Sequence, residues 1–164
     1  MKKFLPLLLS LLYFTANAQE EAIFSHYTIN PMLTNPGATG FDEENHNIFL
    51  NLRSAWTGFP GAPNTYSVNY NGPIGKNIGI GALLYSENIA SLTRYRAQLS
   101  YSIKFQAGDY KFGAGLSTEL HRIQLDNGAL QANPELIQGG DIVLADFDNG
   151  DSQVDASIGG YGEY

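Results

Sequence analysis

The 164-residue sequence contains no cysteine, which excludes disulfide bonds, thiolate metal sites, cysteine nucleophiles and a lipid-anchored N-terminal cysteine. Only 15% of the residues are charged, against about 25% in an ordinary soluble domain. The sequence has nine basic and sixteen acidic residues. The scarcity of basic residues argues against nucleic acid as a partner, because phosphate binding needs clustered basic side chains. After residue 15 no apolar run approaches the about 20 residues of a spanning helix. These shortages disfavour both a soluble enzyme and a helical membrane protein.

The N-terminus has the pattern of a secretory signal peptide. Two lysines precede an apolar stretch over residues 4–14, and Ala16-Asn17-Ala18 fits a small-x-small cleavage site. A buried core helix is the alternative, but nothing nearby has a helical period. We therefore predict that residues 1–18 are removed by a cut between Ala18 and Gln19, and that the protein is exported.

The exported part consists of segments in which apolar and polar residues alternate. The clearest segment is residues 93–105. One of its faces would carry Tyr95, Ala97, Leu99, Tyr101, Ile103 and Phe105, and the other Arg94, Arg96, Gln98, Ser100, Ser102 and Lys104. The pattern recurs over residues 46–53, 64–71, 77–86 and 109–121, and a further segment begins near Val154. A period of two is that of a β-strand, so the sequence predicts an all-β fold of about six strands.

The lengths and connections of these segments favour a membrane β-barrel. Most segments have 8–13 residues, and a tilted strand needs about 9–11 residues to cross a bilayer. Their second face is small or polar, as on the lumen side of a barrel. Short turns at residues 72–76 and 106–109 alternate with longer loops at 54–63, 87–92 and 122–153, as in outer-membrane barrels. A soluble β-sandwich, whose strands also alternate, is the competing fold.

The number of strands indicates an incomplete barrel. The smallest membrane barrels have about eight strands, and an open sheet in lipid leaves unpaired backbone groups at both edges. We expect residues 46–164 to form part of a larger antiparallel outer-membrane β-barrel. Either the sequence is the N-terminal portion of a longer protein, or several chains share one barrel.

Six polar side chains are expected to face the lumen of this barrel. They are Arg94, Arg96, Gln98, Lys104, Lys111 and Glu119. Glu119 and Asp155 could balance the basic residues, because buried charges must be paired. The polar lining of an ordinary barrel lumen would explain these six side chains. A channel that prefers anions is the more specific alternative.

Three motifs follow one another in the exported part. They are residues 24–40 (FSHYTINPMLTNPGATG), residues 53–63 (RSAWTGFPGAP) and residues 76–81 (KNIGIG). Together they resemble the PorP/SprF family of Bacteroidetes outer-membrane proteins, with small departures at His26 and Gly37. The positions that match the family motif are Asn30, Pro31, Asn35, Pro36, Arg53, Trp56, Gly58, Gly61 and Pro63.

The resemblance implies an outer-membrane component of the type IX secretion system. Such a protein would dock or anchor secreted adhesins or secretion-machine proteins, and in some relatives it serves gliding motility. Its partners would be outer-membrane lipid, other type IX components and secreted surface adhesins. A passive porin or small-solute transporter is the alternative function, because the expected lumen face is charged and rich in glycine.

The first two motifs also have physical roles of their own. Asn30-Pro31 and Asn35-Pro36 are turn-initiating pairs that favour neither helix nor strand, so we expect residues 19–45 to be non-regular. This segment could lie in the periplasm, plug the lumen, or simply lead into the first strand. Trp56, in the first long loop, could pack on the barrel rim or anchor a partner.

No constellation in the sequence supports catalysis, a cofactor or a metal site. His26, His46 and His121 lie in three separate segments without metal-ligand spacing. The acidic stretch over residues 141–155 resembles a calcium loop only loosely, because Asp151, the sixth position counted from Asp146, stands where glycine is required. A solvated loop is the expectation there, with weak calcium binding at Asp146–Asp151 as the alternative.

Overall fold

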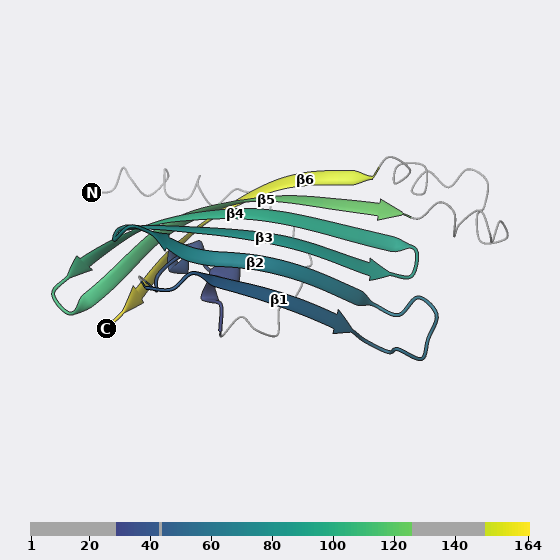
Figure 1. The fold of residues 1–164 in the computed structure, drawn as a ribbon. Helices are drawn as coiled ribbons and strands as arrows, with labels where there is room; N and C mark the ends of the chain where they lie inside the picture. Colours follow the sequence, from purple (N-terminus) through teal and green to yellow (C-terminus); the bar gives the residue numbers. More distant parts are fainter. Residues whose placement is uncertain (1–28, 43, 126–149) are drawn as a thin grey trace, which may run out of the picture.

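The computed structural model describes residues 29–42, 44–125 and 150–164, and these residues form one antiparallel sheet. Its strands pair in chain order (Figure 1). They are β1 (Asn47–Ser54), β2 (Asn64–Ile74), β3 (Ile78–Ile89), β4 (Leu92–Ala107), β5 (Tyr110–Leu125) and β6 (Asp151–Glu163). The signal peptide and its cleavage site lie outside the described residues.

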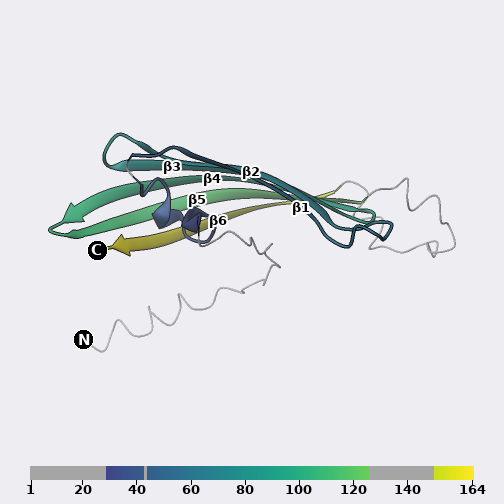
Figure 2. The same cartoon turned by 60° about the horizontal axis from the view of Figure 1, so that its bottom comes forward.

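The all-β, antiparallel prediction is confirmed, and the sheet is open rather than closed into a barrel. Within the described residues β1 pairs only with β2, and β6 pairs only with β5. Figure 2 shows the long, twisted sheet with two short helices beside one of its faces. Neither of these described helices has the length and apolar character needed to cross a membrane.

Many apolar side chains of the sheet are exposed and many of its polar side chains are buried, which is the reverse of a soluble protein. On β4, Leu99 is 69% exposed and Ile103 is 53% exposed, whereas Ser102 and Lys104 are 0% and 5% exposed. A soluble β-sandwich would bury its apolar face against a second sheet. The described residues form a single sheet, and among them no second sheet covers its apolar face.

Strand register aligns the apolar side chains into continuous rows across the sheet. One row runs through Leu50, Val68, Leu84, Ala97, Leu120 and Val154. Since successive residues of a strand point to opposite faces, the matching register keeps every member of this row on the same face. We call this face the apolar face and the opposite one the polar face.

The connections differ from expectation at two places. Residues 87–92 were expected to form a long loop, but β3 and β4 continue to Ile89 and Leu92 and leave a two-residue turn. Ala90 occupies this turn with φ 51°. The turn expected at residues 72–76 is also shorter, because Pro73 belongs to β2. Proline is tolerated there because β1 begins opposite Asn71, so that side of Pro73 has no strand partner.

Two Asn-Pro pairs begin the short 3₁₀ helices that precede the sheet. These helices are η1 (Pro31–Leu33) and η2 (Pro36–Ala38), each with proline at its first position. Proline suits that position because its missing N–H would be unsatisfied anyway. The Asn35 side chain accepts a hydrogen bond from the Gly37 N–H at 2.9 Å and so caps η2.

Candidate functional site: the polar face of the sheet

The segment of residues 29–42, called here the plug segment, lies on the polar face (Figure 2). Hydrogen bonds to three strands hold this segment along its length. The Asn30 amide donates to the Asn69 side chain at 2.6 Å, and the Asn35 amide donates to the Gly160 carbonyl at 2.8 Å. The Lys104 amine donates to the Gly40 carbonyl at 2.7 Å. The plug segment is therefore fixed to strands β2, β4 and β6.

A row of small residues forms the floor under the plug segment. Register aligns Gly79, Ser102, Gly115 and Gly159 across β3 to β6. A Cβ added at Gly115 would overlap the Pro36 carbonyl. Glycine is thus required where the backbone of the plug segment touches the backbone of the sheet.

A small apolar cluster anchors the first turn of the plug segment. Met32 and Leu33 of η1 pack with Leu83 and Tyr85 of β3, and all four are buried. Fully burying a side chain of this size contributes about 1.5–3 kcal/mol. The plug segment is therefore held by apolar packing as well as by hydrogen bonds.

The link from the plug segment to β1 is a tight turn at Asp42. The Asp42 carboxylate accepts a hydrogen bond from the Asn45 amide at 2.8 Å and another from the Glu44 N–H at 3.1 Å. These two bonds, the Asn45 side chain first, hold the pKa of the Asp42 carboxyl below its usual range. They direct the chain from the plug segment into the sheet.

A charged network lies on the polar face between the plug segment and the loop end of the sheet, the end formed by residues 55–63 and 90–91. Arg96 on β4 forms an ion pair with Glu119 on β5, including a hydrogen bond of 2.8 Å. His121 Nε2 lies 2.6 Å from the Glu119 carboxylate and 3.6 Å from that of Asp155. Arg94 pairs with Glu87 at 3.6 Å.

A cavity of about 470 Å³ opens beside this network. One wall is apolar and comes from the plug segment, with Met32, Leu33 and Pro36. The other wall is polar and comes from β3 to β6. Within the described residues, no group of three histidine, aspartate or glutamate side chains is placed to hold a metal ion.

A protein-family model, described as type IX secretion system membrane protein PorP/SprF, matches residues 16–164. The chain belongs to the PorP/SprF family. The resemblance drawn from the three motifs is thereby confirmed, and the family is one of type IX secretion system membrane proteins. No curated protein and no solved structure matches the chain.

The PorP/SprF motif positions fall into two separate groups in the structure. Asn30, Pro31, Asn35 and Pro36 lie in the plug segment on the polar face. Arg53, Trp56, Gly58, Gly61 and Pro63 lie at the end of β1 and in the loop of residues 55–63. The two groups therefore do not form one site.

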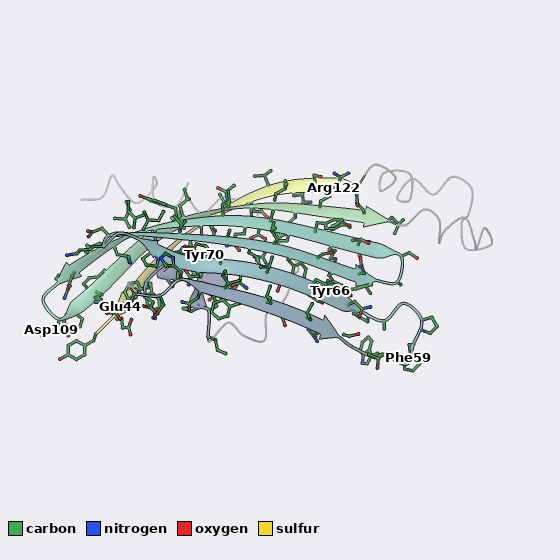
Figure 3. All side chains as sticks on the ribbon, viewed as in Figure 1. Glu44, Phe59, Tyr66, Tyr70, Asp109 and Arg122 are labelled. Carbon is green, nitrogen blue, oxygen red and sulfur yellow. The ribbon has the colours of Figure 1, made fainter. Side chains whose placement is uncertain are left out.

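The loop of residues 55–63 is pinned to its surroundings but exposes two aromatic side chains. The Ala55 N–H donates to the Pro63 carbonyl at 3.0 Å, and the Ala90 N–H donates to the Gly61 carbonyl at 3.0 Å. Trp56 is 73% exposed and Phe59 is 74% exposed. Figure 3 shows Phe59 at the opposite end of the sheet from Glu44 and Asp109. Because the described sheet is open, rim packing and partner anchoring by Trp56 both stay predictions.

The six side chains expected in the lumen all lie on the polar side of the sheet by register. Four of them are buried there, namely Arg96, Gln98, Lys104 and Glu119. Arg94 is partly exposed near the loop end, and Lys111 pairs in register with Glu163 near the opposite end. The acidic stretch over residues 141–149 lies outside the described residues.

Sequence reasoning overlooked the residues that receive the plug segment. Ser102 donates a hydrogen bond to the Thr39 carbonyl, and Asn71 accepts one from the Gly40 N–H at 2.6 Å. The available signal was the concentration of glycine and serine on the polar face. This concentration of glycine and serine can be interpreted only when the strand register is known, because the floor under the plug segment comes from four different strands.

Proposed function

We propose that the described sheet is a section of an outer-membrane β-barrel whose apolar face contacts lipid. Outward side chains of β4 run from Tyr95 to Phe105, an interval of ten residues. At about 3.3 Å per residue and a tilt of about 40°, this interval spans about 25 Å, the height of the apolar band of such barrels. Aromatic residues stand at both limits, as in an interfacial girdle.

The limits of the apolar face support this placement. Beyond the row that contains Leu52, Tyr66 and Tyr95, the next outward row is entirely polar. That row contains Ser54, Asn64, Asn88, Thr93 and Gln124. The short turns would face the periplasm and the loop end would face the cell exterior, as in outer-membrane barrels generally. The sheet edges at β1 and β6 would be closed by further strands, because lipid offers no hydrogen-bond partners.

Within this barrel the protein serves as a docking or anchoring component of type IX secretion rather than as a catalyst. The observation that carries this function is the occupied polar face. An open pore needs a water-filled lumen, whereas here the plug segment, with buried Asn30, Met32 and Thr39, covers the part of the polar face near the short turns. The partners would be other type IX components and secreted surface adhesins, with a role in gliding where the organism glides.

Deleting the gene tests this function. The expected result is loss of adhesin display at the cell surface and accumulation of the adhesin inside the cell. Complementation with the wild-type gene is the control. Unchanged secretion and display in the deletion strain would rule the docking role out.

A passive porin is the second candidate, and one observation favours it. The polar face carries charged side chains beside a cavity of about 470 Å³, which is typical of a wet lumen. Conductance of the reconstituted protein in planar bilayers separates the two functions.

A further inference from the structure

The cavity beside the plug segment has a wall of oxygen acceptors. Register places Gln98, Glu119 and Asp155 side by side on β4, β5 and β6, and all three line the cavity. Nearer the loop end, Glu87 and Asp151 add two more carboxylates to the lining. The wall therefore presents acceptors over three adjacent strands.

The basic residues of the lining leave part of this acidity uncompensated. Arg96 pairs with Glu119, and Arg94 pairs with Glu87. Arg122 also lines the cavity, so four carboxylates and three guanidinium groups stand in the described lining. Among the described residues, His121 Nε2 lies 3.6 Å from the carboxylate of Asp155, whose side chain is 48% exposed.

A buried acceptor in the same wall lacks a donor. Gln98 is 4% exposed, and its amide nitrogen donates to Ser100 at 3.3 Å. Its carboxamide oxygen has no hydrogen-bond partner among the described residues. A buried unpaired acceptor of this kind is costly, so it indicates a missing donor.

The opposite wall suits an aliphatic chain. Met32, Leu33 and Pro36 of the plug segment line it with apolar atoms. The volume of about 470 Å³ is within the range of pockets that hold small ligands, about 300–1,000 Å³. The cavity thus combines an apolar wall with acceptors for a positively charged N–H group.

We propose that this cavity binds an aliphatic cation, namely the side chain of a lysine or arginine that a partner polypeptide inserts from the loop end. The Asp155 carboxylate opposes its charge, the Gln98 oxygen accepts an N–H, and the plug segment covers its methylene groups. The assignment of the cation to a secreted or secretion-machine polypeptide rests on the proposed docking function.

Binding of a defined peptide to the purified full chain in detergent micelles tests this site. The probe is a capped pentapeptide with one central lysine among alanines, followed by calorimetric titration. Its matched comparison carries norleucine in place of lysine, which keeps the aliphatic chain and removes the charge. We expect the lysine peptide to bind and the norleucine peptide to bind at least fivefold more weakly.

Asp155→Asn should weaken binding of the lysine peptide about fivefold or more, because it removes a charge-assisted acceptor. Asp109→Asn is the matched control, since Asp109 lies in the short turn at the other end of the sheet. Equal affinity for both peptides, or for wild type and Asp155→Asn, would overturn the site. If free butylamine bound as tightly as the lysine peptide, the proposal that the cation belongs to a polypeptide would be overturned.

This test is independent of the secretion phenotype. If gene deletion leaves secretion unchanged while the lysine peptide still binds through Asp155, the docking function fails and the cation site stands. If deletion blocks secretion but the peptide does not bind, the cation site fails and the docking function stands.

Discussion

At the residue scale, glycine is needed where the plug segment meets the sheet, and neighbouring glycines differ sharply in this respect. An added Cβ at Gly115 would overlap backbone atoms of Pro36 and Gly37, which cannot move as a side chain can. An added Cβ at Gly160 would have its nearest neighbour at 3.9 Å, an ordinary van der Waals contact. The two positions therefore form a matched pair for substitution.

Gly115→Ala is expected to loosen the plug segment, because overpacking of this kind costs about 1–3 kcal/mol. The absence of cysteine allows one reporter thiol, Met32→Cys, at a position that is 0% exposed. Maleimide labelling of that thiol should become about fivefold faster or more. Gly160→Ala should leave the labelling rate unchanged, and equal acceleration in both variants would contradict the steric explanation.

Single residues also explain why one connection was predicted wrongly. Ala90 adopts φ 51°, a conformation that favours glycine, asparagine or aspartate, so the sequence contains no turn signal at the β3–β4 connection. Pairing of Ile89 with Leu92 and the hydrogen bond from Ala90 to Gly61 fix the turn instead. These are tertiary contacts, which a reading of local sequence does not contain.

At the element scale, alternation predicted the strands well because each strand has two chemically different faces. The segments expected at residues 93–105 and 109–121 lie within β4 (Leu92–Ala107) and, apart from its first residue, β5 (Tyr110–Leu125). The position of the plug segment was left open, since Asn-Pro pairs determine that the chain turns but not what it turns against. Only the register of β3 to β6 shows that Gly79, Gly115 and Gly159 align into a floor.

The same alternation predicts how the apolar face responds to charge. Leu99 lies near the middle of the outward face of β4, whereas Leu52 lies in the row at its limit. Leu99→Arg should destabilise the protein in lipid vesicles by about 2–4 kcal/mol, and Leu52→Arg by about 1 kcal/mol or less. Both leucines are well exposed in the structure, at 69% and 77%.

Urea unfolding in vesicles, followed by tryptophan fluorescence, measures this difference. Trp56 is the single tryptophan and lies in the loop only four residues after Leu52, so each unfolding curve is normalised to the folded baseline of its own variant. If the two arginine variants had equal stability in lipid, the apolar face would not be the lipid-facing surface. Unfolding in the absence of lipid is the control, because exposed positions in water tolerate arginine.

At the scale of the whole molecule, the sheet and the plug segment divide the polar face into two parts. The part near the short turns is filled by residues 29–42, and the part near the loop end holds the charged network and the cavity. A face closed at one end and hollow at the other suits binding of a partner from the open end. It does not suit free passage of solutes.

Conductance of the reconstituted protein tests this division. The wild-type protein in planar bilayers should conduct little, and a variant without residues 29–42 should show discrete conductance steps, because removing the plug segment uncovers the hydrophilic floor of Gly79, Ser102 and Gly115. Trp56→Ala changes the opposite end of the sheet and should leave conductance at the wild-type level. Large conductance in the wild-type protein, equal to that of the deletion variant, would instead favour the passive porin, since the plug segment would then not obstruct the passage of ions.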